Sequence, residues 1–347
     1  MISAAHAASG VSVTRENGVI GLHLIDEMST MVQQSSRSGS AVGSPRGKFA
    51  RHFSGGRGRS RVVNALTVDV EEYFCYAYPG DALPCDRWGE FESRAVPHTL
   101  ETLRILEAHD IRATFFVLGW VAEREPFLVR EIRDRGHEIG SHGYAHELVF
   151  RQSPERFRED LKRSVDAIAS VTGEMPVGYR APSFSINNDC LWALDIIAEM
   201  GFQYDASIFP VRMRHYGANG NTKVPHKLDN GLWEFPAATM EMAGLELPFG
   251  GGGYFRLYPF IVTRWATHRL NGAGRPAMIY LHPWELDPNP PIKPNSRLHR
   301  FQHTVNLSKT RSRLLHLCSE FEFAPMGEVL HHLSTREEPI AEFVAAK

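Results

Sequence analysis

Two histidines, His142 and His146, stand four residues apart just after the short run 137–140. On a helical turn this spacing brings both imidazoles to one face, where they can hold one metal ion. Asp69 and Glu71 stand two apart at the end of an apolar run, so on a regular strand their carboxylates share a face. Two histidines and one carboxylate form a catalytic zinc set with one coordination position open for water. Among seventeen histidines such a pair is a weak signal alone, and a solvated surface is the alternative.

Three further polar residues follow strand-like runs. Arg180 could orient a carboxylate through a forked hydrogen bond, although a surface ion pair is the common alternative. His282 follows the apolar run 277–281 and could act as a general acid, although a buried histidine with satisfied hydrogen bonds is the ordinary case. Asp205 could hold that imidazole in its protonated form, or it could cap a turn.

Strand and helix patterns alternate from residue 62 onward, which indicates a mainly parallel sheet. Because the chemical residues follow strand ends, a β/α barrel with its site at the carboxyl ends is favoured over an open doubly wound sheet. Strands are expected at 65–70, 113–117, 137–140, 177–179 and 277–281 with an added strand at 233–236, and helices at 97–108, 126–135, 153–171, 189–200 and 307–320. A glycine-rich turn is expected at 249–256; no Lys-Ser/Thr follows it as a P-loop requires.

Composition is that of an ordinary soluble globular chain: 347 residues, 43% hydrophobic and 22% charged, with a formal net charge of −2. This balance implies neither nucleic acid nor an anionic membrane as partner. Residues 1–61 are rich in Ser and Gly and carry eight Lys or Arg against three Asp or Glu, so we expect a mostly disordered leader. Neither a signal peptide nor a transmembrane segment is recognised, which predicts a protein that is cytoplasmic or peripheral at the inner membrane.

Taken in order, five segments resemble the motifs of the NodB-homology polysaccharide deacetylases. They are Thr67-Val68-Asp69, Ser141-His142 through His146, Arg180-Ala181-Pro182-Ser183-Phe184, Asp205 and Leu281-His282. A finer resemblance, to the branch encoded with exosortase (PEP-CTERM) exopolysaccharide loci, lies in residues 69–74, 251–256, 282–285 and 297–307. Val70 departs from the pattern, since the family has a metal-binding Asp at this position. Glu71 is the expected substitute, and Asp69 itself is the alternative ligand.

The resemblance implies an α/β fold, a distorted (β/α) barrel of the NodB-homology type with a C-terminal extension. The expected domains are a leader at 1–61, a deacetylase barrel at 62–286 with an insertion at about 206–276, an extension at 287–335 packing on the barrel, and a tail at 336–347.

The resemblance also implies a metal-dependent hydrolase that removes N-acetyl groups from amino-sugar units of a polysaccharide in exopolysaccharide biosynthesis. Glu71, His142 and His146 would hold a divalent ion, expected to be zinc. Asp69, oriented by Arg180, would act as base, and His282, steadied by Asp205, would act as acid. A backbone N–H near Ala206 would stabilise the oxyanion. The expected sugar-binding aromatics are Phe184, Tyr254 and Trp284, although core packing is the more common fate of such rings.

Two alternatives remain open from the sequence. The same barrel could hydrolyse a cyclic amide or imide, as the family's allantoinase-like relatives do. The chain could instead be a non-catalytic carbohydrate-binding component of an export complex. The expected partners are an N-acetylated polysaccharide or oligosaccharide and an exopolysaccharide synthesis or export complex.

Overall fold

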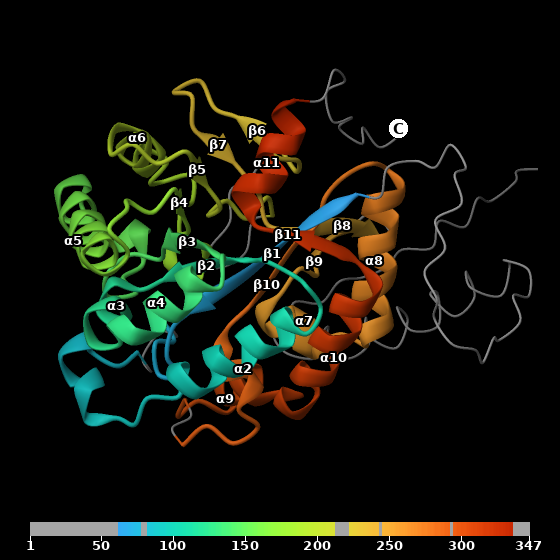
Figure 1. Ribbon diagram of the computed structural model, residues 1–347, viewed down its shortest axis with the longest axis horizontal. Helices are drawn as coiled ribbons and strands as arrows, with labels where there is room; N and C mark the ends of the chain where they lie inside the picture. Colours follow the sequence, from blue (N-terminus) through green and yellow to red (C-terminus); the bar gives the residue numbers. More distant parts are fainter. Residues whose placement is uncertain (1–61, 78–81, 212–221, 243–244, 292–293, 336–347) are drawn as a thin grey trace, which may run out of the picture. The chain divides into compact units, whose positions relative to one another are not determined.

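The computed structural model describes residues 62–77, 82–211, 222–242, 245–291 and 294–335 (Figure 1). Contacts separate the chain into Met1–Ala50 and Arg51–Lys347, and every described residue belongs to the second unit. The predictions of a disordered leader at 1–61 and of a tail at 336–347 lie outside the described residues.

A nine-stranded, mostly parallel sheet forms the centre of the fold, with the order β10-β1-β2-β3-β4-β5-β7-β6 and with β11 beside β1. Within the described residues, β10 and β6 do not pair with each other, so the sheet does not close. The sheet is a curled half-barrel, which confirms the predicted distorted barrel. Only β6 runs antiparallel to its neighbour. The strands are β1 (Val63–Val70), β2 (Thr114–Val117), β3 (Glu138–Ser141), β4 (Gly178–Tyr179), β5 (Tyr204–Asp205), β6 (His226–Lys227), β7 (Trp233–Glu234), β10 (Met278–Leu281) and β11 (Glu322–Ala324).

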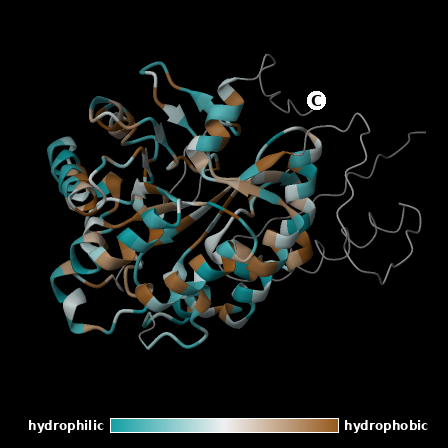
Figure 2. Ribbon diagram, in the orientation of Figure 1, coloured by the Kyte–Doolittle hydropathy of each residue, from teal (hydrophilic) through white to brown (hydrophobic). Residues whose placement is uncertain are grey.

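Helices cover the outside of the sheet, and their outward faces are hydrophilic while the central strands are hydrophobic (Figures 1 and 2). They are α2 (Ala95–Glu107), α3 (Gly119–Arg124), α4 (Pro126–Asp134), α5 (Pro154–Thr172), α6 (Trp192–Glu199), α7 (Gly252–Leu257), α8 (Phe260–Gly272), α9 (Arg297–Thr304), α10 (Leu307–Glu320) and α11 (Met326–Ser334). None of these helices is long and apolar enough to cross a bilayer.

Local sequence explains the clearest elements. All four residues of β2, Thr-Phe-Phe-Val, are buried, as expected for a central parallel strand that is covered on both faces. Helix α5 begins after Ser153, whose hydroxyl accepts a hydrogen bond from the backbone N–H of Arg156, and Pro154 occupies its first turn. It ends at Gly173, which takes a left-handed φ of 79° that a glycine adopts without steric cost.

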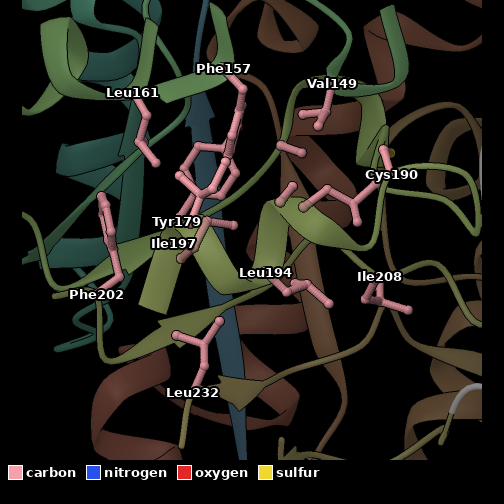
Figure 3. Packing of buried hydrophobic residues seen from close by; sticks show 14 residues of the cluster. Val149, Phe157, Leu161, Tyr179, Cys190, Leu194, Ile197, Phe202, Ile208 and Leu232 are labelled. Carbon is pink, nitrogen blue, oxygen red and sulfur yellow. The ribbon is translucent and has the colours of Figure 1, made fainter. Parts of the chain in front are cut away.

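One hydrophobic cluster fixes α5 and α6 against β4 (Figure 3). Phe157 of α5 and Tyr179 of β4 meet edge to face with ring centroids 5.8 Å apart. Phe157 also contacts the ring of Trp192 at the start of α6. Because Arg180 directly follows Tyr179, this packing fixes the point at which β4 delivers Arg180 to the carboxyl end of the sheet.

The C-terminal segment contributes directly to the sheet. Strand β11 pairs in parallel with the first half of β1, and α10 and α11 flank it in the chain. Between β7 and β10 lie a separate hairpin, β8 (Thr239–Met242) with β9 (Leu245–Pro248), and the helices α7 and α8. The glycine-rich turn predicted at 249–256 is helical in its second part, because α7 begins at Gly252. Gly251 lies against Tyr280 of β10 through an isolated parallel bridge.

Candidate metal and catalytic site

Glu71, His142 and His146 converge at the carboxyl ends of β1 and β3. One ligand atom from each lies within 4.8 Å of the others, and all three residues are buried. The Glu71 Oε2 atom lies 2.8 Å from His146 Nε2 and 3.7 Å from His142 Nε2. Among the described residues, this is the one group of His, Cys, Asp or Glu side chains in which three ligand atoms lie close enough to hold a metal ion.

The two histidines meet through a loop, so the expectation of one helical face is wrong. Residues 142–148 follow β3 without helical structure. Gly143 and His146 both take left-handed φ values, 74° and 53°. The Asp160 carboxylate of α5 fixes this turn by accepting a hydrogen bond from the Tyr144 backbone N–H at 2.9 Å. The loop geometry, rather than a helical repeat, brings the imidazoles together.

The donor set fits a divalent metal ion. His142 Nδ1 lies 2.8 Å from the backbone carbonyl of Arg180, an acceptor that fixes the proton on Nδ1 and leaves the Nε2 lone pair facing Glu71. Glu71 Oε2 is buried and faces the Nε2 atoms of both histidines. Two imidazole nitrogens and one carboxylate oxygen suit zinc and similar first-row ions.

Glu71 is held in its ionised form. Burial alone would raise the pKa of its carboxyl group, but the neighbouring His146, His282 and His142 outweigh burial and keep the pKa well below its usual range. Its Oε1 atom accepts a hydrogen bond from the indole N–H of Trp284 at 3.2 Å. The adjacent Glu72 points elsewhere: its carboxylate accepts hydrogen bonds from the backbone N–H groups of Arg94 and Ala95, at the start of α2.

Asp69 and Arg180 form a buried ion pair beside the metal cluster. Arg180 Nη1 donates to Asp69 Oδ1 at 2.7 Å, and the two side chains are 0% and 2% exposed. Arg180 also donates to the hydroxyl of Thr67 and to the carbonyl of Ala206. The predicted pairing of these two residues is therefore present. With Oδ1 occupied, Asp69 Oδ2 is the oxygen that faces His282 Nε2, at 3.8 Å.

His282 joins the same site from the end of β10, which neighbours β1. Its Nε2 lies 3.7 Å from Glu71 Oε1, and its Nδ1 lies 3.5 Å from Glu285 Oε2. Burial alone would lower the pKa of the imidazole, but Glu71, Glu285 and Asp69 outweigh it and raise the pKa to about 9. At neutral pH this ring can therefore donate a proton.

The structure does not bring Asp205 to His282. Asp205 is fully buried, and its carboxylate accepts hydrogen bonds from the backbone N–H and the hydroxyl of Ser207. It also interacts with Glu234 at the end of β7, where burial and the Asp205 charge raise the pKa of Glu234 well above its usual range. The carboxylate that faces His282 Nδ1 is Glu285 instead.

The expected oxyanion donor near Ala206 is also in use elsewhere. The Ala206 N–H donates to the Tyr179 carbonyl at 2.9 Å, and the Ser207 N–H donates to Asp205. The Ala206 N–H joins β5 to β4 and the Ser207 N–H is bound within the turn after Asp205, so both are already engaged.

Of the three expected sugar-binding aromatics, two present little ring surface. Phe184 and Trp284 are each 6% exposed. Phe184 packs on Phe209 and Tyr280, while Trp284 stacks on His282 and on His303, with ring centroids 4.3 Å apart in the latter pair. Both rings are therefore engaged in packing, and Trp284 also supports Glu71; sugar stacking by these rings stays a prediction. Tyr254 of α7 is half-buried and keeps part of its surface exposed.

Sequence reasoning missed two charged residues near the site. Glu285 contacts His282, and Arg256 of α7 pairs with Glu285 at 2.7 Å. Both lie inside segments that carry the finer resemblance, 282–285 and 251–256. The i, i+3 spacing of His282 and Glu285 is the sequence signal that could have identified Glu285.

Two family models match the chain. Residues 89–204 match one described as polysaccharide deacetylase, and residues 206–331 match one described as a domain of unknown function (DUF3473).

Curated relatives carry deacetylase names. A peptidoglycan deacetylase of Helicobacter pylori is 32% identical over 149 residues, which is 42% of this chain and 49% of the relative. A peptidoglycan-N-acetylglucosamine deacetylase of Bacillus cereus is 31% identical over 133 residues, 36% of this chain and 46% of the relative. The chain thus spans less than half the length of these relatives.

Solved structures share the fold. A candidate polysaccharide deacetylase from Mycobacterium smegmatis superposes with a TM-score of 0.54 at 21% identity, covering 85% of this chain and 98% of that one. Puue allantoinase superposes with a TM-score of 0.53 at 16% identity, covering 81% and 93%.

Proposed function

We propose that this chain removes N-acetyl groups from amino-sugar units of a polysaccharide. The proposal is supported by the match of residues 89–204 to the polysaccharide deacetylase family and by the deacetylase names of the relatives. One observation carries the proposal. The buried cluster of Glu71, His142 and His146 lies directly beside the Asp69 carboxylate and the His282 imidazole. Amide hydrolysis needs a base, an acid and charge stabilisation at one place, and these residues supply groups for each need.

Glu71, His142 and His146 would hold a divalent ion, which we propose is zinc. Such an ion supplies Lewis-acid polarisation of the acetyl carbonyl and lowers the pKa of a bound water. The Glu71 carboxylate balances part of the ion's charge, and the contact between His142 Nδ1 and the Arg180 carbonyl keeps that imidazole oriented.

The residues of the chain move the protons. Asp69, anchored by Arg180, takes a proton from the attacking water through its free oxygen Oδ2. The water oxygen bonds to the acetyl carbon, and the carbon–nitrogen bond breaks. His282 gives its Nε2 proton to the departing amine, so the products are acetate and a free amino sugar. Deprotonated Asp69 and protonated His282 are therefore the starting states. The neighbouring carboxylates of Glu71, Glu285 and Asp69 outweigh burial and favour the protonated state of His282.

The finer identity of the substrate rests on the resemblance of residues 251–256, 282–285 and 297–307 to the exosortase-associated branch. The proposed substrate is accordingly an N-acetylated polysaccharide or oligosaccharide of exopolysaccharide biosynthesis. The proposed location is the cytoplasm or the inner-membrane periphery, in association with a synthesis or export complex.

Acetate release from N-acetylglucosamine oligomers, with and without chelator, tests the reaction class. We expect release that chelation abolishes and that His142→Ala lacks. A panel that includes cyclic amides and imides separates deacetylation from the allantoinase-like alternative. Sugar binding without acetate release by metal-loaded protein would favour a non-catalytic component and overturn the proposal.

A further inference from the structure

Two buried charged side chains next to the site have no part in the proposed chemistry. Arg256 of α7 is 2% exposed and Glu285, in the 3-10 turn η4 (Pro283–Leu286), is 0% exposed. Arg256 Nε donates to Glu285 Oε1 at 2.7 Å. Because desolvation of two charges offsets most of their attraction, such a pair adds little stability over an apolar pair of similar size. Fold stability alone therefore does not account for it.

Arg256 is itself tied to the C-terminal part of the chain. Its Nη1 donates to the backbone carbonyls of His303 and Val305, and its Nη2 donates to that of Gln302. The Arg256 carbonyl accepts the side-chain amide of Asn306 at 2.9 Å. The guanidinium thus has its position fixed by α7, by η4 and by the end of α9.

Glu285 uses its second oxygen to hold His282. Oε2 accepts the His282 backbone N–H at 3.1 Å and lies 3.5 Å from His282 Nδ1. The other ring nitrogen, Nε2, faces Asp69 and Glu71 at 3.8 and 3.7 Å. Trp284 stacks on the same imidazole, with an interplanar angle of 22°. Nδ1 therefore faces the Glu285–Arg256 pair, and Nε2 faces the site of reaction.

We propose that Glu285 and Arg256 are positioning residues, which hold the His282 ring so that Nε2 points at the departing amine; this rests on the proposed deacetylation. Glu285 then takes the place predicted for Asp205. The proposal also gives a role to the segment 206–331, which matches a domain of unknown function. This segment supplies His282 together with Arg256, Glu285 and the backbone carbonyls that fix Arg256.

The test compares metal-loaded wild type with Glu285→Gln, which removes the charge at nearly constant volume. Because Glu285 acts through His282 and contacts no substrate, kcat on N-acetylglucosamine oligomers should fall about 10–100-fold with KM unchanged, the size typical of lost supporting contacts. Cleavage of 4-nitrophenyl acetate should stay within about twofold, since its phenolate leaves without a proton and needs no general acid. Glu285→Asp, which keeps a carboxylate, should recover part of kcat.

Glu320→Gln is the matched control. Glu320 also pairs with an arginine and a histidine, Arg264 and His268, but on the outer surface of α8 and α10. It should leave both activities unchanged. If Glu285→Gln does not fold, the apolar double variant Arg256→Met/Glu285→Leu keeps the site packed and should show the same selective loss.

Oligomer kcat within twofold of wild type in Glu285→Gln or in the double variant overturns the inference. Equal losses on amide and ester also overturn it, because they mark a general structural effect. Absence of acetate release by the wild type contradicts the proposed function itself. The wild type is therefore assayed first, before any variant.

Discussion

Arg180→Met should destabilise the fold strongly by leaving the Asp69 carboxylate buried without its cation. The two side chains are 0% and 2% exposed and meet at 2.7 Å. Removal of one partner of a buried pair typically costs about 3–5 kcal/mol. His282 Nε2, 3.8 Å from the other Asp69 oxygen, is a more distant partner and compensates only in part. Since domains are stable by about 5–15 kcal/mol, this loss is a large fraction of the total.

A second substitution isolates the cause. In Arg180→Met/Asp69→Asn the orphan charge is gone, so the double variant should recover most of the loss. A deficit of about 1–2 kcal/mol should remain from the missing hydrogen bonds to Thr67 and to the Ala206 carbonyl.

Urea unfolding followed by far-ultraviolet circular dichroism gives these free energies. Chelator is present throughout, so that metal binding does not contribute to stability. Both variants should also lose acetate release, because Asp69 is either unanchored or no longer a base. An Arg180→Met cost below about 1 kcal/mol, or a double variant no more stable than the single one, would refute the reasoning.

Three other outcomes follow from the same geometry. Zinc at about 100 times its Kd should stabilise the protein by about 2.7 kcal/mol and raise Tm by about 5–10 °C in a thermal scan, and His142→Ala should remove the shift. Burial alone would raise the pKa of Glu285, but Arg256 and His282 outweigh it and hold the pKa to about 2, below the usual 4.5. The stability advantage of wild type over Glu285→Gln should therefore be present above pH 4.5 and shrink as pH falls towards 2, as urea unfolding at each pH will measure. A Cβ at Gly251 would lie 2.1 Å from the Tyr280 carbonyl oxygen, so Gly251→Ala should lower the free energy of unfolding by about 1–3 kcal/mol, whereas Gly253→Ala, with open space around it, should not.

The elements were predictable where sequence pattern and burial agree. The expected helix 307–320 coincides with α10, and the strand at 277–281 contains β10. The convergence of His142, His146 and Glu71 was also predictable, because parallel strands deliver their following residues to the same edge of the sheet.

The errors arise from information that local sequence does not carry. His142 and His146 meet through left-handed backbone at Gly143 and His146, which a spacing rule does not reveal. The predicted pairing of Asp205 with His282 depends on strand order, which local sequence does not carry. Four strands, β1 to β4, separate β5 from β10, whereas Glu285 reaches His282 within a single turn.

The central claim is that Glu71, His142 and His146 hold the ion on which N-deacetylation depends. The most direct test strips the purified protein with chelator, restores zinc, and measures bound metal and acetate release from N-acetylglucosamine oligomers in the same samples. One ion per chain, with release that appears on restoration and is absent in His142→Ala, is the predicted result. Acetate release that persists without metal, or at full rate in His142→Ala, would contradict the claim.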